Sequence, residues 1–149
     1  MIRDARLTFG APVALNTGAA GSYNLGDVID LTTTGRDIGA GEGVGDLFLV
    51  IMVTTAATSG GAATLQFNLI TSDAPAMTSP TIITGTQAFP LASLTNGAQL
   101  LAIRLPAAVY KRYIGLQQVT GTAAFTAGSV HAFFAEDVPA IRFYPQAFG

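Results

Sequence analysis

The strongest constraint on this fold is a series of short strand-like runs separated by turn residues. Residues 63–70 alternate apolar and polar side chains, the two-residue period of a strand with one buried face. Residues 47–55 are apolar at both parities and end in two threonines, which favours a strand covered on both faces. We expect one core that contains Leu47, Leu49, Ile51, Val53, Leu65, Phe67 and Leu69.

The remaining runs raise the number of expected strands to about eight, with no convincing amphipathic helix. They lie at residues 7–9, 28–31, 81–86, 98–105, 113–120 and 129–135. Short strands at this spacing, joined by Gly, Pro, Ser and Thr, predict an all-β fold, an antiparallel β-sandwich. The longish connections favour a jelly-roll-like arrangement of two sheets. A length of 149 residues fits one domain with a single core.

The region around residues 111–137 contains two of these runs in close succession. It opens on Lys111, Arg112 and Tyr113 and closes on the acidic pair Glu136 and Asp137. Its two runs are joined by a Gly-bounded connection of small residues. This pattern predicts a hairpin with a long loop.

The two ends of the chain differ in composition from the middle. We divide the sequence into an extended N-terminal arm (1–21), a β-sandwich (22–137) and a C-terminal aromatic tail or arm (138–149). Both ends mix arginine with large apolar groups, a composition enriched at the centres of protein interfaces. The predicted contacts with a partner or with another subunit are Arg3, Arg6, Phe9, Arg142, Phe143, Tyr144 and Phe148. Alternatively, both segments cap the open ends of their own sandwich.

Charge is unusually scarce. Only 11% of residues are charged, below the usual share of a free surface. Between Leu47 and Ile103 the sole charged residue is Asp73. We therefore expect partners to cover much of the surface, in a homodimer first and a trimer second. Arg104 and the pair Lys111 and Arg112 would keep one face soluble or bind acidic groups of a partner. A neutral surface of Thr, Ser, Gln and Asn is the alternative.

Several classes of partner are not supported by the sequence. The longest strongly apolar run, residues 47–53, is shorter than the roughly 20 residues that a membrane helix needs. No apolar leader follows Met1, so we expect synthesis in the cytoplasm and no export. The seven basic residues are scattered, which argues against a nucleic-acid groove. The absence of cysteine excludes disulfides and thiolate metal sites.

Catalytic chemistry is equally unsupported. His131 is the only histidine, and no Gly-x-Ser-x-Gly motif accompanies it, so a structural or surface imidazole is the favoured interpretation. The acidic, glycine-containing stretch at residues 27–46 does not have the spacing of an EF-hand, and we interpret it as a solvated loop. We expect no catalytic residue, no metal and no cofactor.

Several segments together resemble the small capsid cement (decoration) proteins of short-tailed phages. They are Ile2-Arg3-Asp4, Val28-Ile29-Asp30-Leu31, Arg36-Asp37-Ile38-Gly39, Gly61-Ala62-Ala63-Thr64-Leu65 and, most strongly, residues 111–137. The resemblance implies a jelly roll on the outer surface of an icosahedral virion, where a homo-oligomer bridges major capsid proteins. The tail after Asp137 is longer than this family leads us to expect.

A carbohydrate- or receptor-binding β-sandwich is the alternative function. Sugar sites use exposed aromatic platforms beside polar side chains. This chain has no tryptophan, and its four tyrosines are not clustered in sequence. The cement interpretation is therefore preferred.

Overall fold

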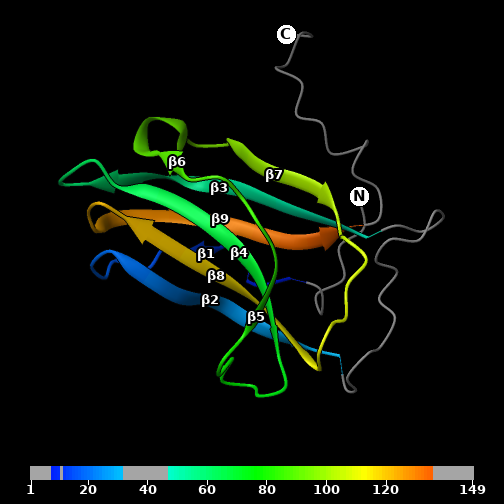
Figure 1. Cartoon of the computed structure of the whole chain (residues 1–149). Helices are drawn as coiled ribbons and strands as arrows, with labels where there is room; N and C mark the ends of the chain where they lie inside the picture. Colours follow the sequence, from blue (N-terminus) through cyan, green and yellow to red (C-terminus); the bar gives the residue numbers. More distant parts are fainter. Residues whose placement is uncertain (1–7, 11, 32–46, 136–149) are drawn as a thin grey trace, which may run out of the picture.

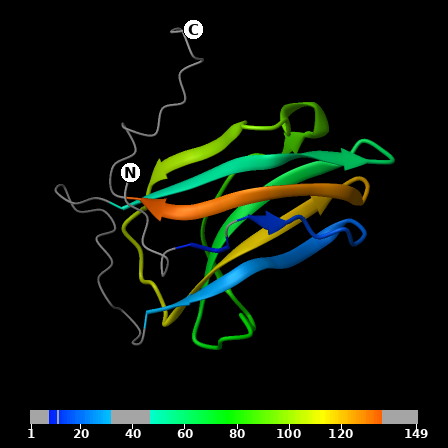
Figure 2. The same ribbon diagram turned by 180° about the vertical axis from the view of Figure 1, so that it is seen from behind.

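The computed structural model describes residues 8–10, 12–31 and 47–135, which form two antiparallel sheets (Figure 1). The first sheet contains, in spatial order, β1 (Val13–Ala14), β9 (Phe125–Ala135), β3 (Phe48–Ser59) and β7 (Gln99–Arg104), as Figure 2 shows from behind. The second contains β2 (Gly21–Asp30), β8 (Tyr113–Gly121), β4 (Thr64–Ser72) and β5 (Thr81–Gly85). The short strand β6 (Phe89–Pro90) also pairs with β4, and a single turn of 3-10 helix follows it at Leu91–Ser93.

The order of the strands is that of a jelly roll. β5 and β6 pair with the same side of β4, opposite β8, so they form one interrupted edge strand. Each sheet then has four strand positions, and only the connection from β4 to β5 stays within a sheet. Every other connection crosses from one sheet to the other. The predicted all-β sandwich of jelly-roll type is therefore confirmed.

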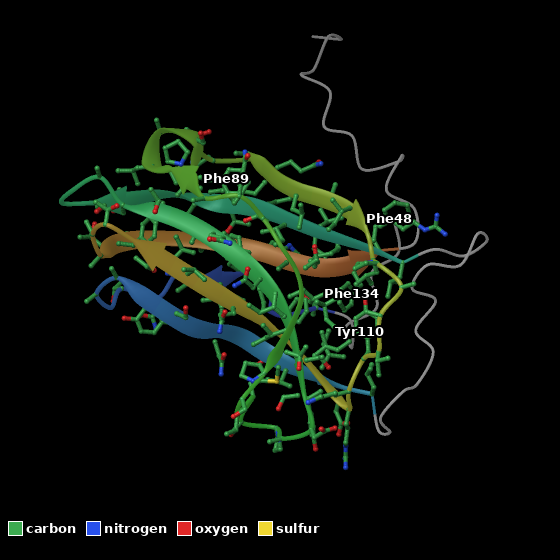
Figure 3. All side chains as sticks on the ribbon, viewed as in Figure 1. Phe48, Phe89, Tyr110 and Phe134 are labelled. Atoms are coloured by element: carbon green, nitrogen blue, oxygen red, sulfur yellow. The ribbon has the colours of Figure 1, made fainter. Side chains whose placement is uncertain are left out.

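The core lies between the sheets, where the sequence placed it. Leu65, Phe67 and Leu69 of β4 are each at most 1% exposed, and they belong to one cluster with the predicted residues of the 47–53 run. Phe134 on β9 and Tyr110, both labelled in Figure 3, belong to this core as well. The alternation of β4 was thus interpreted correctly, because one of its faces meets the opposite sheet.

Strand β3 is buried on both faces at its first half. Leu49 and Ile51 point into the main core. Val50 points the other way and forms a second buried cluster with Phe133 and Ala135 of the neighbouring β9. This arrangement confirms the two-sided strand expected at residues 47–55 and explains why its apolar pattern has no alternation.

The predicted hairpin at residues 111–137 is wrong. β8 and β9 are both strands, but β8 pairs with β2 and β4, whereas β9 pairs with β1 and β3. Residues 122–124 carry the chain from one sheet to the other, and Thr122 has a positive φ of 68°. Both strands contribute side chains to the core between the two sheets. Neighbouring strands that pair and neighbouring strands that stack have the same sequence pattern.

The described residues of the predicted N-terminal arm (1–21) pack on their own sandwich. Phe9 is fully buried, with its ring edge-on to Phe134 at a centroid distance of 5.4 Å. Thr8 forms a β-bridge with Phe133, and β1 pairs with β9. Residues 8–10 and 12–21 therefore complete the sandwich at the open side of β9. Residues 1–7 and the tail at 138–149 lie outside the described residues.

Candidate functional site: a charged end and a neutral end

The charged residues of the described chain gather at one end of the sandwich, which we call the charged end. Strands β2, β4, β7 and β9 finish there, and β3, β5 and β8 begin there. Each charge lies within the last four residues of a strand or within two residues of a strand terminus: Asp27, Asp30, Asp73, Arg104, Lys111 and Arg112. Phe48 marks this end in Figure 3, and Phe89 lies toward the opposite end.

The opposite, neutral end is closed by small and hydroxyl-bearing residues. Its described connections are residues 15–20, 60–63, 94–98 and 122–124, and none of these carries a charge. Hydroxyl groups fasten the turns: Ser59 Oγ donates to the Ala124 carbonyl at 2.7 Å, and the hydroxyls of Thr58 and Thr126 lie 2.7 Å apart. The two ends of the described sandwich therefore differ in charge: one end carries the charged residues and the other carries none.

A two-point ion pair fixes the edge strand β2 at the charged end. Arg112 Nε and Nη2 donate to the two carboxylate oxygens of Asp30 at 2.9 and 3.0 Å. These hydrogen bonds raise the pKa of Arg112 above its ordinary value. The guanidinium also lies over the ring of Tyr113, 5.0 Å from its centroid. Planar, bidentate pairing of this kind holds its geometry better than a single contact, although both side chains remain about half exposed.

Lys111 is anchored to the end of β4 by a second set of contacts. Its ammonium lies 3.5 Å from Asp73, and its backbone N–H donates to the hydroxyl of Thr71 at 2.8 Å. That buried hydroxyl donates in turn to the Tyr113 carbonyl at 2.9 Å. Lys111 and Arg112 are therefore paired within the chain, a possibility that the sequence analysis did not include. Arg104 is exposed at the last residue of β7.

The connection from β7 to β8 packs across the charged end. Leu105 donates its N–H to the Leu47 carbonyl at 2.8 Å. Tyr110, which belongs to this connection, is buried, and its hydroxyl donates to the Pro106 carbonyl at 2.7 Å (Figure 3). Burial raises the pKa of Tyr110 to about 12. The connection that carries Lys111 and Arg112 is therefore packed against the core, which holds the ion pairs of the charged end in place.

A buried amide that the sequence analysis missed joins the two sheets. Gln118 on β8 is fully buried between them. Its Oε1 accepts the N–H of Asn16 at 2.8 Å, and its Nε2 donates to the Asn16 carbonyl at 3.0 Å and to the Thr120 hydroxyl at 2.8 Å. The amide of Gln118 thus satisfies both backbone groups of Asn16, as the backbone of a neighbouring strand would, and so holds the link between β1 and β2. Its one sequence signal was a polar residue on the inward parity of an apolar strand.

His131 lies on the outer face of the first sheet. Its neighbours Val130 and Ala132 point into the core, and its ring centroid is 4.8 Å from that of Phe133. The described part of the chain brings together no group of three or more metal-ligating His, Asp or Glu side chains. It also contains no helix long and apolar enough to cross a membrane.

Of the seven predicted contact residues, the described chain contains only Phe9. Its side chain belongs to the core, not to an exposed contact surface; this is the alternative in which the segment packs on its own sandwich. Arg3, Arg6 and the four tail residues Arg142, Phe143, Tyr144 and Phe148 lie outside the described residues. Their roles stay predictions.

The strand order and the two unlike ends define the described part of the chain as a jelly roll. Residues 14–134, which run from the last residue of β1 to the last but one residue of β9, match the model of the family Bbp16. The chain therefore belongs to the phage-related family Bbp16, and the family places it among virion-related proteins. No curated protein sequence matches the chain.

Proposed function

We propose that this chain is a structural, non-enzymatic cement protein that decorates the outer surface of an icosahedral phage capsid and bridges major capsid protein subunits. Membership of a phage-related family over residues 14–134 is the observation that carries this proposal. The jelly roll supports it, because a sandwich of two sheets presents two ends and four sheet edges to neighbouring molecules. The scarcity of charge supports it as well, since such surfaces favour association.

The charged end is the surface that we assign to the capsid protein. The described chain stops at Leu31 and Ala135 and resumes at Leu47, and all three positions lie at this end. The charges of residues 32–46 and 136–149, which lie outside the described residues, are therefore joined to the sandwich at this end, where the Asp30–Arg112 and Asp73–Lys111 pairs also lie. Individually such exposed charges contribute little free energy. Repetition over a capsid lattice converts weak contacts into firm attachment.

Binding to capsids that lack this protein tests the proposal directly. Purified protein is added to such capsids, which are then sedimented, and the bound protein is counted per capsid subunit. We expect saturation at a fixed ratio and density for a sandwich on the outer surface by electron microscopy. Protein that stays in the supernatant at all concentrations would contradict the proposal. Binding to a glycan array in its place would favour the carbohydrate-binding alternative.

A matched pair of variants tests the assignment of the charged end. Lys111→Glu reverses a charge beside Asp73, and Thr95→Glu introduces the same residue at an exposed position of the neutral end. We expect Lys111→Glu to weaken capsid binding and Thr95→Glu to leave it unchanged, with melting curves confirming that both variants fold. Equal loss in both variants would move the contact away from the charged end.

A further inference from the structure

The four sheet edges differ in how well they are protected against pairing with another chain. Exposed edges are normally blocked by charge, by irregular pairing or by shortness. Edge strand β2 carries Asp27 and Asp30 and has a register shift between Leu25 and Ile29. Edge strand β1 has only two residues, and β7 ends in Arg104. Strands β5 and β7 also pair with a register shift, so irregular pairing does not separate the edges. Charge does separate them: among the described edge strands longer than two residues, β5 alone carries no charged residue.

The edge formed by β5 has no charge. Its sequence is Thr-Ile-Ile-Thr-Gly, and among the described strands it pairs only with β4. No charged residue occurs between Asp73 and Arg104 in the sequence. Leu69 of β4 lies opposite Thr84 of β5, and Ile70 lies opposite Ile82. Ile83 is therefore the extra, unpaired residue at this register shift. Ile82 is 57% exposed, although its two β-branched neighbours in sequence are suited to a strand interior.

We infer that β5 is the self-association edge of this protein, where it pairs antiparallel with β5 of a second copy about a two-fold axis beside Ile82. A second copy fits because the edge is self-complementary: an uncharged strand meets an uncharged strand, and the two Ile82 side chains cover each other. Two-fold pairing places the same patch on both sides, as an isologous interface requires. Strand addition at an open edge supplies main-chain hydrogen bonds on top of this apolar contact. This inference rests on the self-association that belongs to the proposed function and assigns it to one strand.

A charge placed on the edge tests the inference. Ile82→Lys introduces an ammonium at the two-fold axis, where the two copies would repel each other. Val109→Lys is the matched control, since Val109 is 79% exposed and lies on the connection between β7 and β8. By sedimentation over a range of concentrations we expect a wild-type dimer. Ile82→Lys should raise its dissociation constant by roughly tenfold or more, and Val109→Lys should not change it.

Cysteine cross-linking gives a second, independent reading. The chain has no native cysteine, so an Ile82→Cys variant carries a single thiol. Directly opposed residues of an antiparallel pair lie close enough for a disulfide, and mild oxidation should yield a covalent dimer. A Val109→Cys variant treated in the same way should remain monomeric on a denaturing gel.

The outcomes separate this inference from the proposed function. A wild-type monomer at all concentrations overturns the inference. A dimer that Ile82→Lys does not weaken, or that Ile82→Cys does not cross-link, places self-association on another surface and also overturns it. Neither result affects the capsid-binding measurement, which uses an independent assay. Loss of capsid binding with an intact Ile82 cross-link would contradict the proposed function alone.

Discussion

Replacement of Gln118 by methionine isolates the contribution of the buried amide that joins the two sheets. Methionine has similar length and volume but offers no hydrogen-bonding group of comparable strength. The change removes the acceptor for Asn16 N–H and the donors to the Asn16 carbonyl and the Thr120 hydroxyl. Thr120 is only 2% exposed, so water cannot replace its lost partner.

The magnitude follows from these three contacts. Each ordinary hydrogen bond contributes about 0.5–1.5 kcal/mol net, and a buried group left unsatisfied costs about 1–3 kcal/mol. Asn16 is half-buried and recovers part of its hydration. Better burial of the methionine side chain offsets some of the remainder. We expect a loss of about 2–4 kcal/mol in the free energy of unfolding, or about 6–12 °C in melting temperature for a chain of this length.

The neighbouring residue supplies the control. Gln117 points to the opposite face of β8, where it accepts a hydrogen bond from Asn68 Nδ2 at 3.1 Å. Gln117→Met loses this one contact, so its cost should be about 0.5–1.5 kcal/mol. Urea unfolding of both variants measures the difference. If Gln118→Met is as stable as Gln117→Met, the buried amide does not fasten the N-terminal strand and the argument fails.

Three further perturbations address other parts of the molecule. Gly26→Ala should lower the free energy of unfolding in urea by more than about 3 kcal/mol, because φ is +71° and the new Cβ would lie 1.9 Å from the Phe9 carbonyl oxygen. Gly97→Ala is the control: its φ is +78°, but the new Cβ would meet open space, so the loss should be about 1 kcal/mol. Equal losses in the two variants would refute the steric argument. The pKa of Tyr110 is raised from 10.0 to about 12 in the folded chain, so its contribution to stability is complete below pH 10 and is lost as the pH rises toward 12; Tyr110→Phe should remove this part of the alkaline dependence, and an unchanged profile would contradict it. Deletion of residues 140–149 should leave the melting temperature nearly unchanged while weakening binding to capsids or between subunits, whereas failure to fold would assign the tail to the core.

Strand identity was predictable here because the strands are short and their apolar patterns are strong. β4 alternates because one face meets the core, and β3 does not alternate because Val50 is buried on its outer face. The first half of β2 was missed: residues 21–27 contain two glycines and three polar residues in an edge strand. An edge strand needs fewer apolar residues than a central one, so its composition resembles that of a loop.

Strand pairing was less predictable than strand identity. A tight two-residue turn specifies a hairpin, but a connection of several small residues allows the next strand to pair beside the first or to stack on it. The jelly roll itself settles the choice, because in this topology β8 and β9 must lie in opposite sheets. The predicted hairpin and the predicted jelly roll were therefore incompatible with each other. Topology was the stronger of the two predictions, since it used the number and spacing of all the strands.

The long interval between Leu47 and Ile103, which contains a single charged residue, corresponds to a defined part of the fold. It covers β3 to β7, and its one charge, Asp73, lies where β4 ends. The turns at the other end of these strands are uncharged, and so is the edge strand β5. The described chain runs back and forth between the two ends of the sandwich but places its charged residues at one end. It therefore has a charged surface at that end and uncharged surfaces elsewhere. The charged end can bind partners through polar contacts that salt weakens, whereas the β5 edge relies on apolar contact and main-chain hydrogen bonds. Raised salt should therefore release a contact at the charged end and leave an association through β5 intact.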